Sequence, residues 1–570
     1  MQSADRNPIL GYQMLNITGD DVTELLGFMI DADFNEQVTK YYPKETQRIN
    51  DICNVLSFED CPADVLENLD GYLCGHYPPL ISIPRIRHSS ISLADLGQLM
   101  LQSKFARCRT RFVVPSFSFQ QKYVCRSSTL SGPLEFYGRQ VATVAGFTFD
   151  GHVVNPPSGG ELQDISLETE NGRQSLEKLR DDDCELIRRL NVTYICDFML
   201  EYRKIKCWVP ISSSEKVDQQ GRYNDLIIIP LPYPGSEFFR IWRDSGYAMH
   251  NLFFDWNRSG VEVPVNPDLI PKTLFSASIE WSSYKSWDIH TITMNYMKLL
   301  LGLLYEGAGG LLLHCVSGWD RTPLFICLLR CLLWADDLMH SSLKPIQMLY
   351  LTLGYDWFLF GHKLQTRMEL GEEILRFTFQ FISEMANCTD LSLRKVYDIH
   401  VTADSKNSDS DDSPFIDLRS SDDLQRLRQS RLEELSTLFF QYWNKELREH
   451  VNRFNVNNKS SDINESVTLD KNTCNTRKSI CKDDTISESS NNPENKDETL
   501  TDVNYMNRNR SSRSGSQQSI VYKISNVLTS AVSVVTTNLV SSILPSASSS
   551  SSDSNINSNN KTKIRKDSVT

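Results

Sequence analysis

The sequence contains no run of 18 or more uninterrupted apolar residues, so it predicts no helix that crosses a membrane. The first ten residues, MQSADRNPIL, also lack the charged start and the apolar stretch of a secretory signal. The 14 cysteines are scattered over 570 residues without a repeating spacing. We therefore expect a protein of the reducing cytosol, where a reactive thiolate can persist.

The chain also has fewer positive than negative side chains, with 59 Lys and Arg against 72 Asp and Glu, so its formal net charge is -13. Such a balance disfavours nucleic acid and anionic membrane as general partners, so any anionic substrate must be captured by a local positive pocket. No Cys-x2-Cys pair accompanies Cys61, Cys74 and His76, which would be a partial zinc set. We therefore expect no metal site and no cofactor.

Short strand-like runs alternate with periodic helical stretches between residues 101 and 400. This alternation predicts an α/β fold in which a central sheet is flanked by helices. Strands are expected at 111–119, 122–128, 192–200, 226–229 and 311–315, and a long helix at 287–305.

The rest of the chain divides by composition. A length of 570 residues suggests two or three units, at roughly 100–200 residues per domain. The tail is rich in Ser, Asn, Asp, Lys and Thr, and it has too few apolar residues to order itself. We expect a helical and loop region at 1–100, a polar insertion at 150–175, an acidic linker at 402–414, an amphipathic helix at 420–455 and a mostly disordered tail at 456–570.

The segment LHCVSGWDRT, residues 313–322, has the form Cys-x5-Arg and lies between an apolar strand and an apolar helix that begins near Pro323. Successive backbone N–H groups of such a loop can form a nest for one phosphoryl group at a helix N-terminus. Cys315 would lie at its floor, where the helix dipole and Arg321 lower the pKa of the thiol. The sequence therefore predicts a cysteine-dependent phosphatase with Cys315 as its nucleophile.

Each remaining residue of the loop has an expected task. Arg321 supplies a planar fork that grips two phosphoryl oxygens, Gly318 allows a tight backbone path, and Thr322 can donate a hydrogen bond to the sulfur. The predicted phosphate-binding residues are Val316, Ser317, Gly318, Trp319, Asp320 and Arg321, with His314 and Thr322 in support.

The proton donor has three candidates in the sequence. Asp320 lies inside the loop, next to Arg321, where it can protonate the leaving oxygen and then activate water. Asp288 follows Trp287 upstream, and Asp255 is a weaker third candidate. Each can instead be a solvated carboxylate or a helix cap, and Asp288 is placed to cap a helix beginning at Ile289. We favour Asp320 as the general acid.

The loop HCVSGWDRT resembles the active-site loop of the myotubularins, whose usual form is Cys-Ser-Asp-Gly-Trp-Asp-Arg-Thr. Val316 and Ser317 replace the Ser and Asp of that form, and the other positions match. The segments RRLNVTYICDFM, PYPGSEFF and YDWFLFGH are similar to the Jumpy-type branch of the myotubularin-related proteins. The resemblance covers roughly residues 100–390, so we interpret 101–400 as the cysteine-phosphatase domain.

The resemblance implies a protein tyrosine phosphatase-like fold and an activity toward phosphoinositides. The expected reaction removes the 3-phosphate of phosphatidylinositol 3-phosphate, and also of the 3,5-bisphosphate, through a cysteinyl-phosphate intermediate. It also implies Asp320 as the general acid, a lipid partner at a membrane surface, peripheral association with endomembranes from the cytoplasm, and a role in autophagy.

Two other functions stay open from the sequence alone. One is a protein tyrosine or dual-specificity phosphatase. The other is a catalytically inactive adaptor that binds phosphoinositides, which the retention of Cys315 and Arg321 disfavours. Within the tail, residues 519–545 place apolar side chains on one helical face, a pattern typical of helices that lie on a membrane. Protein partners are expected to bind through the same tail.

Overall fold

The computed structural model describes residues 16–31, 43–58, 60–87, 91–132, 176–206, 209–218, 220–393 and 421–465. The expected polar insertion at 150–175, the acidic linker at 402–414 and the segment at 519–545 lie outside these residues. The described residues up to Glu465 belong to one compact unit.

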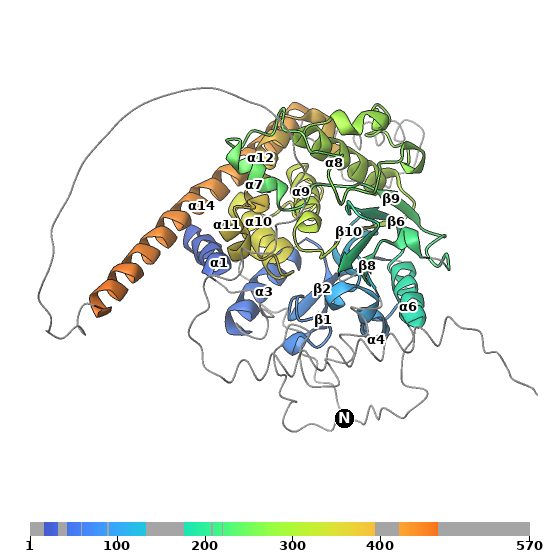
Figure 1. Cartoon of the computed structure of the whole chain (residues 1–570), viewed down its shortest axis with the longest axis horizontal. Helices are drawn as coiled ribbons and strands as arrows, with labels where there is room; N and C mark the ends of the chain where they lie inside the picture. Colours follow the sequence, from blue (N-terminus) through green and yellow to red (C-terminus); the bar gives the residue numbers. More distant parts are fainter. Residues whose placement is uncertain are drawn as a thin grey trace, which may run out of the picture. The chain divides into compact units, whose positions relative to one another are not determined.

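A five-stranded sheet with the order β3-β4-β10-β6-β9 forms the centre of this unit (Figure 1). Strands β4, β10, β6 and β9 are parallel to one another, and β3 is antiparallel to β4. All six residues of the middle strand β10 are buried, as expected for a parallel strand that is covered on both faces. The bounds are β3 Val114–Phe119, β4 Lys122–Ser128, β6 Val192–Asp197, β9 Ile227–Pro230 and β10 Gly310–Cys315.

Helices cover this sheet, and α9 (Arg321–Ala335) is the most deeply buried of them. All of its residues after the first are buried, so it is apolar on every side rather than on one stripe. It packs against β10 and against α8 (Ile289–Glu306), α12 (Ile374–Ala386) and α14 (Ser421–Glu465). The prediction of an α/β fold with a central sheet flanked by helices is confirmed.

The first hundred residues contain a strand pair that the sequence did not lead us to expect. Strands β1 (Ala63–Glu67) and β2 (Leu80–Pro84) form an antiparallel pair, so an expectation of helices and loops alone is wrong for this region. Neither segment shows the alternation of a half-buried strand, and the pairing joins residues across a connection that includes Pro78-Pro79. Helices α3 (Pro43–Phe58) and α4 (Leu93–Ser103) pack against this pair, whereas α1 (Gly19–Asp31) packs against α14.

A second small sheet, of order β5-β8-β7, lies beside the main one and was not predicted either. Its strands are β5 Leu130–Ser131, β8 Val209–Ser213 and β7 Arg203–Lys206. The remaining α-helices are α6 Leu176–Arg189, α7 Phe238–Asp244, α10 Pro345–Leu351 and α11 Leu364–Leu370, and a π-helix, η7, spans Thr352–Phe358. The short 3-10 helices are η1 Leu69–Gly71, η2 Lys104–Ala106, η3 Cys108–Thr110, η4 Glu215–Val217, η5 Pro267–Leu269, η6 Trp281–Ser286 and η8 Thr389–Leu391.

Helix α14 extends from Ser421 to Glu465, beyond the expected end at residue 455. It packs on α1, α9, α10 and α12, and Figure 1 shows it running along the side of the unit (orange). The Phe439 ring stacks on Phe379 with centroids 4.1 Å apart, and the Arg428 guanidinium pairs with Asp336 at 3.0 Å. Within the described ranges no helix is both long and apolar enough to cross a bilayer.

Candidate active site

Cys315 ends the central strand β10, at the carboxyl edge of the parallel sheet. Ligands of open α/β sheets bind at this edge, because the loops that leave the strands meet there. The loop that follows β10 leads directly into α9, which begins at Arg321, two positions before Pro323. The strand, the loop and the helix N-terminus expected from the motif are therefore all present.

The carbonyl oxygen of Gly318 is held on the outside of the loop by two buried arginines. It accepts hydrogen bonds from Arg111 Nη2 at 3.0 Å and from Arg126 Nη2 at 3.2 Å. The N–H of the same residue, which belongs to the preceding peptide unit, donates to Cys315 Sγ at 3.2 Å. Gly318 has a φ of +73°, and a Cβ at this position would lie 2.5 Å from the carbonyl oxygen of Ser127. A larger residue would therefore clash and be strained here.

Two further carbonyl groups of the loop are also bonded from outside. Val316 O accepts from Thr129 N at 3.4 Å, and Trp319 O lies 3.0 Å from His362 Nδ1. His362 Nδ1 also faces an oxygen of Asp320 at 3.1 Å, so this nitrogen faces two acceptors and must carry the proton. Because a trans peptide unit directs its C=O and the N–H of the next residue in opposite directions, these three contacts turn the N–H groups of Ser317, Trp319 and Asp320 toward the inside of the loop. Successive inward N–H groups are the geometry of an anion nest.

The Cys315 thiol is stabilised as an anion by its surroundings. Its side chain is buried, and Thr322 Oγ1 donates a hydrogen bond to Sγ at 3.3 Å. Burial alone would raise the pKa of the Cys315 thiol, but the positive charge of Arg321 and the hydrogen bonds from Thr322 lower it further than burial raises it. The net effect is a pKa below that of an ordinary cysteine, as a nucleophilic thiolate requires.

The Arg321 guanidinium is anchored at one nitrogen. Its Nη1 donates to the carbonyl oxygens of Phe198 and Tyr233, at 2.5 and 3.1 Å. Among the described residues no hydrogen-bond partner is recorded for its Nε or Nη2. One edge of the fork is thus fixed by the backbone, and the other edge can grip two oxygens of a phosphoryl group.

Asp320, the favoured general acid, is paired with a cation that sequence reasoning missed. Its two carboxylate oxygens accept from Arg367 Nε at 3.1 Å and Arg367 Nη2 at 2.6 Å, and Arg367 also contacts Glu372. Burial would raise the pKa of Asp320, but Arg367 and His362 hold it well below its usual range. Without substrate, Asp320 is therefore a carboxylate rather than an acid that carries a proton.

The other two candidate acids are engaged elsewhere. Asp288 is the N-cap of α8: one oxygen accepts from the Thr291 N–H at 2.8 Å and the other from the Asn251 N–H at 2.9 Å. Burial would raise its pKa, but these hydrogen bonds and His290 lower it. Asp255 is exposed and accepts from the Asn257 N–H at 3.0 Å. Both carboxylates thus fit the capping and surface alternatives considered above.

His314 lies beneath the loop in a chain of buried charges. Its Nε2 is 3.0 Å from a carboxylate oxygen of Glu215, whose other oxygen accepts from Arg107 Nη1 at 2.7 Å. Arg107 in turn binds both oxygens of Asp183, at 2.9 and 2.8 Å. Burial would lower the pKa of His314, but Glu215 and Asp197 raise it, so the imidazolium is favoured. These residues therefore form a chain of ion pairs beneath the loop.

Positive side chains also surround the outer face of the loop. Arg109 Nη1 donates to Ser317 Oγ at 3.0 Å, and its guanidinium lies 4.6 Å from the centre of the Trp319 ring. Lys363 Nζ lies 5.2 Å from the same ring. Although the chain is acidic as a whole, the loop is therefore in a locally positive environment that can attract a phosphorylated ligand.

Five residues that contact the loop were not identified from the sequence, because they are distant from it along the chain. One signal was present: Arg126 is a charge inside the strand-like run KYVCRSS, directly after the apolar residues YVC, and a buried charge requires partners. The five residues are Arg109, Arg111, Arg126, His362 and Arg367.

The first prediction concerns the Cys315 thiolate. Alkylation by iodoacetamide, followed by mass spectrometry, should slow as pH falls through the lowered pKa, because only the thiolate reacts. Thr322→Val removes the donor to Sγ, so its profile should shift to higher pH. Thr378→Val, at a buried threonine that binds only its own helix, is the matched control and should leave the profile unchanged. Identical profiles for wild type and Thr322→Val would contradict this account.

The second prediction concerns the hydrogen bonds from Arg111 and Arg126 to the Gly318 carbonyl. Arg126→Met leaves the carbonyl with one donor and frees the loop to shift, and displacements near 1 Å cost about 100-fold in rate. We expect kcat/KM for a small phosphomonoester to fall by about 100-fold, with far-UV circular dichroism unchanged. Lys122→Met is the control, because Lys122 lies on the same strand but binds the carbonyl groups of Leu304 and Tyr305. Equal losses in both variants would show that the effect is structural.

Comparison with known proteins gives two relatives and no matching family model. Human and mouse proteins with the same name, phosphatidylinositol-3,5-bisphosphate 3-phosphatase MTMR14, are each 41% identical to the chain over 358 residues. The match covers 60% of the chain and 54% of each relative, so the chain spans about half the length of the curated relatives that it matches. The predicted resemblance is thus confirmed: over this part, the chain is similar to a Jumpy-type myotubularin-related phosphoinositide 3-phosphatase.

Proposed function

We propose that the protein is a phosphoinositide 3-phosphatase of the Cys-x5-Arg type, acting on phosphatidylinositol 3-phosphate and on the 3,5-bisphosphate. One observation carries the proposal. The Cys315 sulfur lies under an inward N–H group, accepts from Thr322 and has a pKa lowered by Arg321. This site occurs in a chain 41% identical to relatives that are named as 3-phosphatases.

The chemistry proceeds in two displacements at phosphorus. In the first, the Cys315 thiolate forms an S–P bond, the P–O bond to the inositol ring breaks, and the leaving oxygen takes up a proton. In the second, water attacks phosphorus, the S–P bond breaks and the thiolate leaves. The inward N–H groups of the loop and the Nε and Nη2 atoms of Arg321 hold the phosphoryl oxygens. Thr322 donates a hydrogen bond that stabilises the sulfur as it departs.

Asp320 is proposed to move the proton in both steps. A phosphoryl dianion placed beside this carboxylate raises its pKa, because two negative charges so close disfavour ionisation. Asp320 would then gain a proton as substrate binds, give it to the leaving oxygen, and take one from water in the second step. Its pairing with Arg367 returns it to the carboxylate form once phosphate has left.

The substrate is proposed from both the relatives and the local charge. Arg109 and Lys363 place positive charge beside Trp319, outside the nest, where an anionic headgroup would lie. Peripheral association with endomembranes from the cytoplasm and a role in autophagy rest on the resemblance alone. Binding to membrane through residues 519–545, and to protein partners through the tail, remains a prediction.

A protein phosphatase and an inactive adaptor are the competing functions. The adaptor is disfavoured because the site keeps the groups that catalysis needs. The pKa of the Cys315 thiol is lowered, Thr322 donates to its sulfur, and Arg321 is bound to the backbone through one nitrogen only. A protein phosphatase would use the same loop, so only its substrates distinguish it.

The third prediction is a substrate preference. Water-soluble phosphatidylinositol 3-phosphate and 3,5-bisphosphate should release phosphate faster than a phosphotyrosine peptide, because the positive groups around the nest favour a highly charged headgroup. Cys315→Ser should release none while still binding the lipid headgroup. Faster hydrolysis of the peptide would favour the protein phosphatase, and equal phosphate release by wild type and Cys315→Ser would refute the mechanism.

The fourth prediction assigns the proton. Asp320→Asn should lower kcat for the lipid headgroup by about 10²–10⁴-fold, the usual contribution of general acid catalysis. The loss should be smaller for p-nitrophenyl phosphate, whose leaving oxygen needs no proton. Asp288→Asn is the comparison: it weakens a helix cap and should lower kcat for the two substrates by similar, small factors. If Asp288→Asn shows the dependence on the leaving group instead, Asp320 is not the acid.

A further inference from the structure

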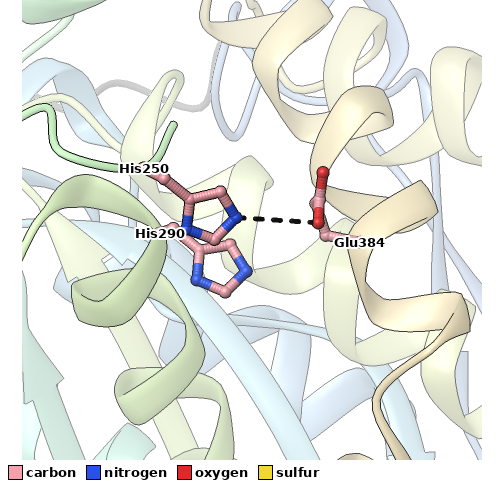
Figure 2. A group of neighbouring side chains, drawn as sticks. All are labelled: His250, His290 and Glu384. Carbon is pink, nitrogen blue, oxygen red and sulfur yellow. Dashed lines mark ion pairs between the residues drawn. The ribbon is translucent and has the colours of Figure 1, made fainter. Parts of the chain in front are cut away.

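Two histidines and a glutamate meet on the surface where three separate segments come together (Figure 2). His250 lies in the turn after α7, His290 in the first turn of α8, and Glu384 near the end of α12. One ligand atom from each lies within 4.8 Å of the other two. Figure 2 shows the two imidazole rings one above the other, with a nitrogen of His250 directed at the carboxylate. None of these residues contributes to the proposed reaction.

The spacing of these atoms is close to that of a bound zinc ion. Zinc binds imidazole nitrogen and carboxylate oxygen at about 2.0–2.2 Å, so two ligand atoms of one tetrahedral ion are about 3.4 Å apart. His250 Nε2 lies 4.0 Å from Glu384 Oε2, and the ring centres of His250 and His290 are 4.2 Å apart. The side chains of His250 and Glu384 are 61% and 42% exposed, so movements of about 1 Å are open to both.

The Asp288 carboxylate faces Nδ1 of His250, whereas Glu384 faces Nε2 of the same ring. Asp288 Oδ2 lies 4.0 Å from His250 Nδ1, and Asp288 is itself fixed by the N–H groups of Asn251 and Thr291. Histidines that bind a metal through one nitrogen usually direct the other N–H at such a carboxylate, which sets the tautomer and the direction of the ring. The arrangement thus supplies a second layer of support as well as ligands.

The three side chains supply donor atoms of the kind that zinc prefers. Two imidazole nitrogens and one carboxylate oxygen make a ligand set suited to zinc and related divalent ions.

We propose that His250, His290 and Glu384 bind a divalent transition-metal ion, zinc by its ligand set, with water completing the coordination. The ion would join the start of α8 to the end of α12. Because both helices pack on α9, which begins at the phosphate loop, the bound ion would stabilise the helices around the candidate active site without taking part in the reaction. The inference is independent of the proposed substrate.

The test uses the full chain in a Cys315→Ser background, because a thiolate such as that of Cys315 would compete for zinc. Isothermal titration with Zn²⁺ should show one site, Co²⁺ should develop the visible absorption of a low-coordinate complex, and Zn²⁺ should raise the melting temperature. His290→Asn and Glu384→Gln should each lower the Zn²⁺ affinity at least about tenfold and abolish the shift in melting temperature.

His450→Asn is the matched control, because His450 is a partly exposed surface histidine near a carboxylate, Asp31, at 3.1 Å. It should leave Zn²⁺ affinity and the shift in melting temperature unchanged. Since the substituted side chains are at the surface, the variants should fold, and circular dichroism checks this. Absence of Zn²⁺ binding, or equal affinity in His290→Asn, Glu384→Gln and His450→Asn, would overturn the proposal.

Discussion

The carbonyl oxygen of Gly318 accepts hydrogen bonds from two buried guanidinium groups, and these bonds set the direction of the peptide groups in the loop. The carbonyl of a trans peptide unit and the N–H of the next residue point in opposite directions, so holding the Gly318 carbonyl outside turns the Trp319 N–H inward. The Gly318 N–H itself donates to the sulfur of Cys315. The inward N–H groups that the proposed phosphate site requires depend on that orientation. Without the two arginines, the loop would keep only the outer contacts of the Val316 and Trp319 carbonyls.

Holding the loop in this way carries an electrostatic cost. Arg126 is fully buried, and burial followed by the nearby charge of Arg111 lowers its pKa to about 9. Hydrogen bonds to the carbonyl groups of Gly318 and Asp356, and the charge of Asp356, offset part of this cost. Ionisable groups with strongly shifted pKa values cluster at functional sites. Here they also bring positive charge to the loop of an acidic chain.

Local features were predictable from the sequence and long-range ones were not. The strand, loop and helix around Cys315 are contiguous, so spacing and turn chemistry were enough to identify them. Strand pairs such as β1-β2 have no local signature, because their partners are specified only when the chain folds. Arg111 and Arg126 lie 207 and 192 positions from the carbonyl that they bind, and no spacing rule connects residues so far apart. The pairing of Asp320 with Arg367 is missed for the same reason.

Helix α14 is the last helix of the compact unit to be synthesised, although it packs on elements from the start and the middle of the chain. It packs on α1 near the start of the chain and on α9, α10 and α12 in the middle, and it places Phe439 and Trp443 in the core. Its residues are the last of the compact unit to leave the ribosome, so the apolar faces that it covers stay exposed until α14 itself has emerged. A nascent chain stalled before that point would carry a complete Cys315 loop on an unfinished core, and chaperones would have to shield it until α14 arrives.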